Sequence, residues 1–190
     1  MHKCVENMDN TQQPHAVYQK SVIEFLTVAN DYCLFIEKAH TYKREEIIHY
    51  VNNIAPLLYL KGNLLPEITT EFPEAGERYV TEENWEIIFN ELRQIFGAED
   101  EFWYINESFF IDSEITKGSI AEYLTDVYQD MKDFVMLYQR DSIEIQKNAV
   151  HIVKMLFKSH WGFKLIRILK NIHYLLYKDF YIEEDPGTGH

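Results

Sequence analysis

Residues 119–140 read SIAEYLTDVYQDMKDFVMLYQR, and this stretch decides the fold class. Its apolar residues recur at alternating spacings of four and three: Ile120, Leu124, Val127, Met131, Phe134 and Tyr138. Such spacing places them on one face of an α-helix. Ser119, followed three residues later by Glu122, forms a capping box, which predicts where the helix begins. We therefore expect an amphipathic helix that ends near Arg140.

The N-terminal part of the chain repeats this periodicity. A first helix should run to about His40, and its apolar face carries Val22, Phe25, Ala29, Tyr32, Ile36 and Ala39. A second helix begins near Lys43, and its apolar face carries Ile47, Val51, Ile54 and Leu58. Pro56 lies within the second helix. Because proline removes a backbone donor, we expect a kink or a new start there.

Residues 62–80 contain two prolines and two glycines, which predicts a loop. Thr81 is a favoured residue type for a helix N-cap. Gly97 can adopt the left-handed backbone conformation that often follows the last residue of a helix. These two signals predict a third helix from about Glu82 to Phe96.

The segment that follows, residues 98–117, is acidic and rich in rings: Phe102, Trp103, Tyr104, Phe109 and Phe110. We expect a loop whose rings pack onto the body of the protein. After the helix that begins at Ser119, Ser142 starts a further helix, with Ile145, Ala149, Ile152 and Leu156 facing the core. Gly162 marks a break before a sixth helix, with Ile166, Leu169, His173 and Leu176 facing inward.

These elements predict an all-α fold, an antiparallel helical bundle of about six helices with an aromatic-rich connector. At least five substantial helices are expected, and no β-sheet of three or more strands. Residues 1–14 read as a disordered leader, residues 15–182 as a single helical domain, and residues 183–190 as a flexible tail.

Composition narrows the function classes. A chain of 190 residues fits one domain, and its net charge of −13 argues against nucleic-acid binding by the surface as a whole. No run approaches the roughly 20 apolar residues that a membrane span needs. The two cysteines, Cys4 and Cys33, cannot form a disulfide framework, so we expect a reducing, cytoplasmic setting.

Charge is unevenly distributed. Residues 143–178 hold seven Lys or Arg and one acid, a charge of +6, so the rest of the chain must carry −19 to reach the total of −13. A cationic stripe at helical spacing lies within this segment: Lys147, His151, Lys154 and Lys158. It could bind an anionic partner. We favour intramolecular pairing with the acids of the preceding helix, with the amine tips of the stripe in solvent.

Four carboxylates share one side of the helix over residues 119–140: Glu122, Asp126, Asp130 and Asp133. Carboxylates of this kind can bind Mg²⁺, as in all-helical phosphohydrolases, or can form a solvated face, which is the commoner outcome for a charge run. A metal site would also need acids from a second helix, and the sequence identifies none.

Two histidines fall on apolar stripes, His160 after Leu156 and His173 between Leu169 and Leu176. A buried imidazole needs partners, and Asp130 borders the neighbouring stripe. We therefore predict a close cluster of Asp130, His160 and His173 on the inner side of the last three helices. Such a cluster could bind a metal or transfer protons, or it could be a hydrogen-bonded part of the core.

Several segments resemble a known family. Asp126-Val-Tyr-Gln-Asp130-Met-Lys132, His160-Trp161-Gly162 and then His173 resemble a bacterial family catalogued only as a domain of unknown function, DUF5063. The resemblance extends from about Phe25 to Leu175, with Met131 where the family pattern has leucine. It implies a helical fold and a bacterial cytoplasmic setting, and it supplies no reaction. It draws attention to one set of residues: Asp126, Tyr128, Asp130, His160, Trp161 and His173.

The sequence contains no recognised catalytic motif, yet its charge is polarised and its connector is aromatic. We therefore expect a non-catalytic protein-interaction or adaptor module with an unknown protein partner. The alternative is a metal-dependent phosphohydrolase or nucleotide-binding protein that uses Asp126, Asp130, His160 and His173. The sequence names no cofactor for either function.

Overall fold

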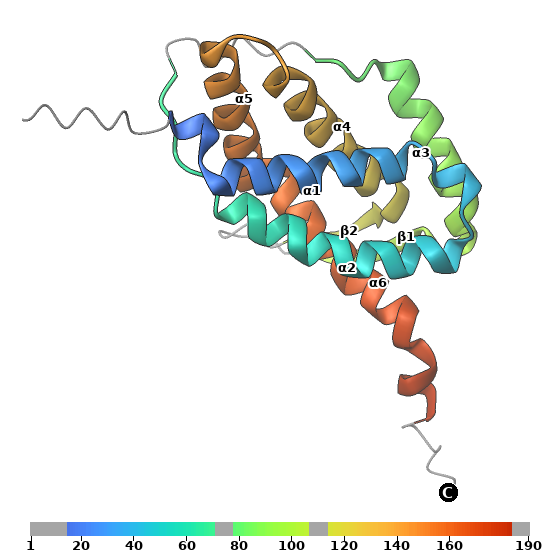
Figure 1. The fold of residues 1–190 in the computed structure, drawn as a ribbon. Coiled ribbons are helices and arrows are strands. Elements are labelled where there is room, and N and C mark those ends of the chain that lie inside the picture. Colours follow the sequence, from blue (N-terminus) through green and yellow to red (C-terminus); the bar gives the residue numbers. More distant parts are fainter. Residues whose placement is uncertain (1–14, 71–77, 107–113, 184–190) are drawn as a thin grey trace, which may run out of the picture.

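The computed structural model describes residues 15–70, 78–106 and 114–183, so the expected leader lies outside the described residues, as does the tail from residue 184. The architecture is mostly helical, as predicted (Figure 1). The α-helices are α1 (Lys20–Ile36), α2 (Arg44–Asn63), α3 (Glu82–Phe96), α4 (Ile120–Tyr138), α5 (Ile143–Leu156) and α6 (Gly162–Glu183). The strands are β1 (Glu101–Asn106) and β2 (Glu114–Ser119).

Helix α4 is central because its whole predicted stripe is buried. It contacts α1, α3, α5 and α6, while α2 packs against both α1 and α6. Helices α1 and α2 lie side by side and run in opposite directions (Figure 1). Half of the predicted α4 capping box is present, since the Ser119 hydroxyl accepts a hydrogen bond from the backbone N–H of Glu122. Thr81 likewise caps α3 by accepting from the N–H of Asn84.

The predicted end of the first helix is wrong, and of the two alternatives expected at Pro56 a new start is not found. Helix α1 ends at Ile36, and Ala39 is buried in a separate 3₁₀ turn, Ala39–Thr41. Helix α2 continues through Pro56 without a new start. Pro56 faces solvent, whereas Ile54, Ala55 and Leu58 beside it are buried against neighbouring helices. That burial outweighs the single hydrogen bond that the proline removes.

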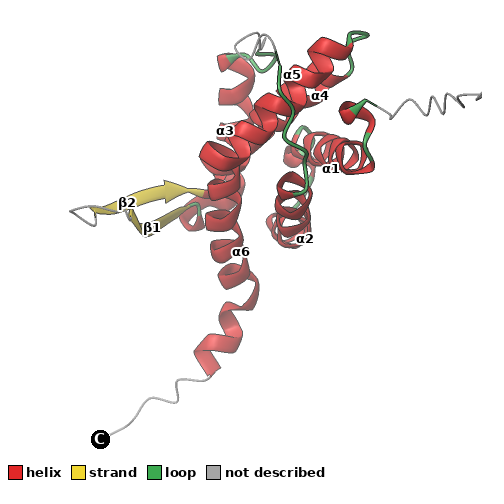
Figure 2. Cartoon of the chain, turned by 90° about the vertical axis from the view of Figure 1, so that its left-hand side faces the viewer, coloured by secondary structure: helices red, strands yellow, loops and turns green. Residues whose placement is uncertain are grey.

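The connector is not a loop in its described part. Strands β1 and β2 form an antiparallel hairpin in which Trp103 lies opposite Lys117 and Ile105 opposite Ile115. Figure 2 shows this hairpin projecting from the helical body. The predicted absence of a sheet of three or more strands holds for the described residues. Phe109 and Phe110 of the connector lie outside them.

The inward faces predicted for α5 and α6 are wrong by about one residue. Helix α5 buries Ala149, Val150 and Val153, while Ile145 is exposed. Helix α6 buries Leu165, Ile168 and Ile172, while Ile166 is exposed. Both helices carry apolar side chains on two adjacent faces, so the contacts of α4 and α2 decide which face is buried. No helix within the described residues has the length and apolarity to span a membrane.

Candidate functional site

The carboxylates of α4 point to different partners. Asp126 accepts a hydrogen bond from the Trp85 indole N–H at 2.9 Å and forms an ion pair with Lys164 of α6. Asp133 accepts backbone N–H groups of Tyr79 at 2.7 Å and Val80 at 3.3 Å. The carboxylates therefore join α4 to three separate segments. Among the described residues, no group of three or more His, Cys, Asp or Glu side chains could hold a metal ion.

Asp130 and His160 form the predicted pair. Nδ1 of His160 lies 2.6 Å from Oδ2 of Asp130, whose side chain is only 3% exposed. His160 belongs to a π-helical turn, Phe157–Trp161, that joins α5 to α6. A π turn inserts extra backbone into a helix and is frequent at functional sites. Here it turns His160 towards α4, while part of its ring remains in solvent.

Trp161 is part of the hydrophobic core. It is fully buried, and its indole N–H donates to the carbonyl of Val153 at 3.0 Å across the π turn. Its ring stacks on Phe25 of α1, with centroids 5.8 Å apart. The same ring lies against Gly62 at the end of α2. Trp161 thus joins three helices, and it has no free polar group for chemistry.

Tyr128 donates its hydroxyl to Oε1 of Glu37 at 3.0 Å, and Lys132 donates to the same oxygen at 2.7 Å. Burial, together with the Glu37 carboxylate, raises the pKa of the Tyr128 hydroxyl well above its usual value. Tyr128, Glu37 and His40 line a hollow of about 280 Å³ together with residues of α3 that include Glu91. Tyr128 therefore forms its hydrogen bond with Glu37 and not with the Asp130–His160 pair.

His173 does not join the cluster, which corrects the prediction. Its side chain is exposed, and its ring contact is with Tyr177, with centroids 4.7 Å apart. The α6 residue that faces the core at this level is Ile172. Because the buried face of α6 is displaced by about one residue from the predicted one, His173 points outward.

The cationic stripe of α5 is also not as predicted. Lys154 is buried and donates to the carbonyls of Gly62 at 3.2 Å and Asn63 at 2.8 Å, at the C-terminus of α2. Burial lowers the pKa of its ammonium. Nδ1 of His151 lies 2.8 Å from the carbonyl oxygen of Ile68. The stripe therefore holds the C-terminal end of α2 and the chain that follows it.

The other two cations of the stripe pair outside α4. Lys147 pairs with Glu144 of its own helix, and Lys158 with Glu67, each at 2.7 Å. The predicted pairing with the acids of the preceding helix is wrong, because Lys164 and His160 bind those acids instead. Lys158 is exposed as predicted.

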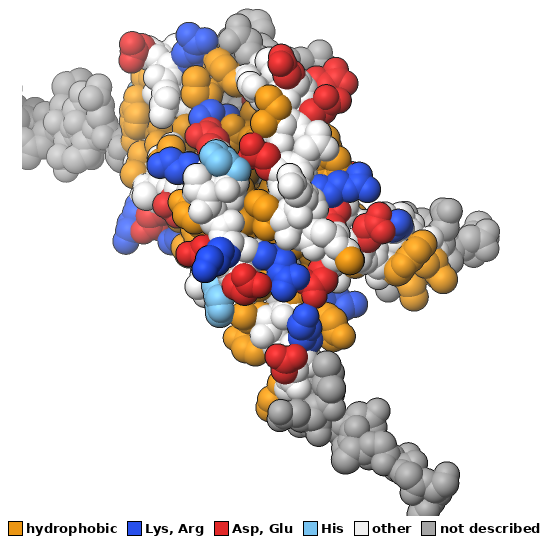
Figure 3. Space-filling model, turned by 90° about the vertical axis from the view of Figure 1, so that its right-hand side faces the viewer, with side chains coloured by type: hydrophobic (Ala, Val, Ile, Leu, Met, Phe, Trp, Pro, Cys, Tyr) orange, Lys and Arg blue, Asp and Glu red, His pale blue; other side chains and the backbone are white. Residues whose placement is uncertain are grey.

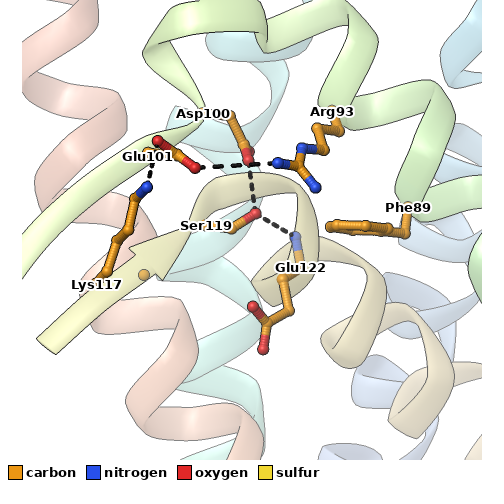
Figure 4. Close-up of a pocket in the computed structure, with 8 residues that line it drawn as sticks. Phe89, Arg93, Asp100, Glu101, Lys117, Ser119 and Glu122 are labelled. Carbon is orange, nitrogen blue, oxygen red and sulfur yellow. Dashed lines mark hydrogen bonds and ion pairs between the residues drawn. The ribbon is translucent and has the colours of Figure 1, made fainter.

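Asp100 is a buried acid that the sequence did not reveal. Its carboxylate accepts the backbone N–H of Ala121 and the hydroxyl of Ser119, both at 2.7 Å. Figure 4 shows Ser119 between Asp100 and the N–H of Glu122. Asp100 thus completes the N-terminal cap of α4, where a helix favours negative charge. The contact joins residues 19 positions apart, so no local pattern signals it.

A shallow hollow of about 190 Å³ opens beside this cap (Figure 4). Three of its charged groups pair with one another, since Glu101 lies 2.6 Å from Lys117 and 4.0 Å from Arg93. The hollow therefore offers the phenyl ring of Phe89, paired charges and the carboxyl of Glu122, whose pKa burial raises.

The outer face of the hairpin carries three exposed apolar side chains that the sequence did not predict, beside the Glu101–Lys117 ion pair. Trp103 is 68% exposed, Ile105 60% and Ile115 69%. Figure 3 shows apolar side chains gathered on this projecting ribbon, at the right of the view. Alternation of side chains along a strand places these three on one face. They therefore form one continuous surface.

The inner face of the hairpin fastens it to the body. Phe102 is buried edge-on against Tyr123, with centroids 5.6 Å apart. Gly118 makes room for the Phe102 ring, because a Cβ at that position would lie 2.6 Å from its Cζ atom. The guanidinium of Arg167 lies 4.1 Å from the centroid of the Tyr104 ring. The outer face is thus presented on a fixed support.

Comparison with known proteins agrees with the resemblance seen in the sequence. The family described as "Domain of unknown function (DUF5063)" matches residues 16–178. The chain belongs to this family. The DUF5063 match includes α4, the π turn and the hairpin.

A solved relative shows the same fold. It is protein BF1032 from Bacteroides fragilis, whose crystal structure is similar to this chain with a TM-score of 0.76 and 32% sequence identity. The similarity covers 92% of this chain and 99% of that chain. No curated protein matches this member of the DUF5063 family.

Proposed function

We propose that this chain is a non-catalytic protein-interaction module of the bacterial cytoplasm, and that the outer face of the hairpin is its contact surface. The observation that carries this proposal is the exposure of Trp103, Ile105 and Ile115 on one face of a ribbon that projects from the body. Contiguous exposed apolar surface is unfavourable in water and marks interaction sites. Tryptophan in particular is enriched among the residues that dominate binding energies.

The support of the hairpin favours the same function. Phe102, Tyr104 and Gly118 fix the inner face, so little conformational entropy is lost when the outer face is covered. The partner is a protein with an apolar surface of its own. Nucleic acid is a poor candidate because the chain carries a net charge of −13.

We extend the proposal to the cytoplasm because two cysteines are too few for a disulfide framework, and Cys33 is a buried free thiol. The bacterial setting is supported by the relative from Bacteroides fragilis. The enzymatic alternative has less support, because Asp126, Asp130 and His173 contact different partners rather than one reaction centre.

The test uses Trp103 as a reporter. A photo-crosslinking amino acid in place of Ile105 should trap the partner in bacterial cells, and the purified partner should then shift the Trp103 fluorescence to shorter wavelength. Trp103→Ser combined with Ile115→Ser should lower affinity by at least about tenfold, because two central apolar contacts are lost. Ile87→Ser on α3, which also removes an exposed apolar side chain, is the matched control. Equal binding by the hairpin variant and the control would refute the proposal.

A further inference from the structure

Helix α6 presents an exposed face of its own. Phe163 is 59% exposed, Ile166 is 51% exposed, and Lys170 and Tyr177 are also exposed on the same side. Figure 2 shows the C-terminal part of α6 extending beyond the other helices of the body. The opposite face of α6 is packed, since Leu165, Ile168 and Ile172 are buried. Helix α6 therefore uses one face to pack against the core and exposes the other.

The spacing on this face is that of a coiled-coil seam. Phe163, Lys170 and Tyr177 follow one another at intervals of seven residues, which is the a position of a heptad. Ile166 and His173 stand three residues after the first two, at the d position. The backbone of Tyr177 leaves helical geometry, with φ −118° and ψ 17°, so the seam ends there. The face thus spans two heptads with a cation at the central a position.

Lys170 differs from its cationic neighbours. Five of the seven Lys and Arg side chains of residues 143–178 donate to oxygen atoms: Lys147, Lys154, Lys158, Lys164 and Lys178. Arg167 lies on the Tyr104 ring. Within the described ranges, Lys170 has neither a carboxylate nor a ring partner. A seam of Phe163, Ile166 and Tyr177 that also carries the His173 imidazole and one unpaired ammonium is complementary to an apolar seam that carries one acid.

We propose that this face of α6 binds an amphipathic helix of a partner protein, with apolar a and d positions and an Asp or Glu placed against Lys170. This proposal rests on the proposed interaction function and assigns it a second surface and a partner chemistry. A single polar residue at an a position selects partner and register at some expense in stability. Here, pairing of Lys170 with the acid on the partner helix would select the partner and its register.

A second copy of this chain fits the face less well than an acidic helix. In a parallel two-fold pairing of α6 with itself, the two Lys170 ammonium groups meet in the same a layer. In an antiparallel pairing, each Lys170 faces a d residue of the other copy, and the second ammonium lies one layer away. Like charges at such an interface oppose association. The net charge of −13 on each copy opposes it further.

The test uses two synthetic peptides of about three heptads with leucine at the a and d positions. They differ only at the central a position, which is Glu in one and Lys in the other. Fluorescence anisotropy of labelled peptide should show the wild-type chain preferring the Glu peptide by at least about tenfold. Lys170→Glu should reverse the preference, and Ile166→Ser should weaken both peptides. Lys20→Glu on α1 makes the same change of charge on another exposed lysine and should change nothing.

Equal affinity for the two peptides, or binding of neither, would overturn the proposal. So would a dimer in analytical ultracentrifugation that Ile166→Ser dissociates, because a second copy would then cover the face. The hairpin variant Trp103→Ser should bind the Glu peptide as the wild type does. A hairpin partner that still binds Lys170→Glu, together with failure of the peptides, would remove this inference and leave the proposed function standing.

Discussion

The indole of Trp161 occupies the space that a side chain at Gly62 would need: a Cβ at that position would lie 2.1 Å from the Cη2 atom of Trp161. This contact joins the last turn of α2 to the π turn between α5 and α6. It explains why a glycine, a poor helix former, stands inside α2.

Gly62→Ala should destabilise the protein by about 2 kcal/mol, because overpacking a rigid indole outweighs the ~1 kcal/mol that alanine gains over glycine in a helix. Urea unfolding followed by circular dichroism measures the change. The same substitution added to Trp161→Leu should cost much less, since the shorter side chain leaves room for the methyl group. Equal costs in the two backgrounds would show that the indole contact is not the cause.

The two histidines should differ sharply in their contribution to stability. His160→Ala leaves the buried carboxylate of Asp130 without its donor, so the free energy of unfolding should fall by about 2 kcal/mol. His173→Ala is the matched control, because its ring is exposed, and it should change stability by less than ~0.5 kcal/mol. Similar losses for both variants in urea unfolding would contradict the placement of His173 outside the cluster.

Lys154 and Lys158 should differ in the same way. Lys154→Met keeps the length of the side chain but removes the donor to the carbonyls of Gly62 and Asn63, so we expect a loss of about 1 kcal/mol. Lys158→Met removes only an exposed ion pair with Glu67 and should cost less than ~0.5 kcal/mol. The stabilities of the two variants can be compared by thermal unfolding under the same conditions. A larger loss for Lys158→Met would contradict the role of Lys154 at the end of α2.

Titration of the Asp133 carboxyl should change the free energy of unfolding with pH. Burial raises its pKa above the ordinary value of 3.8, although the N–H groups of Tyr79 and Val80 act in the opposite direction. The native state therefore binds this proton more tightly than the unfolded state, and its relative stability rises as pH falls from the raised native pKa towards 3.8.

Asp133→Asn removes that linkage. The stability of the wild type relative to Asp133→Asn should therefore be greater at about pH 4 than at about pH 7. Urea unfolding at the two pH values measures the difference. A wild type that loses stability relative to the variant on acidification would show that the N–H groups, rather than burial, dominate the native pKa.

Helix starts and the central helix could be predicted because they depend on neighbours along the chain. Thr81 and Ser119 each accept a hydrogen bond from the backbone N–H three residues on, and every residue of the predicted α4 stripe is buried. The pairing of Asp130 with His160 was also predictable, since an acid and an imidazole both bordered apolar stripes and each needed a partner. Family membership followed from the same segments.

Only the tertiary structure decided the rest, because the deciding contacts join residues far apart in sequence. The apolar residues of α6 form two adjacent faces, and packing against α2 and α4 buried Leu165 and Ile168 and left Ile166 and His173 outside. The ring-rich connector forms a hairpin in which β1 pairs with β2 and Phe102 packs against Tyr123 of α4. Local periodicity sets which residues share a face, and the neighbours that supply the buried area select the face that turns inward.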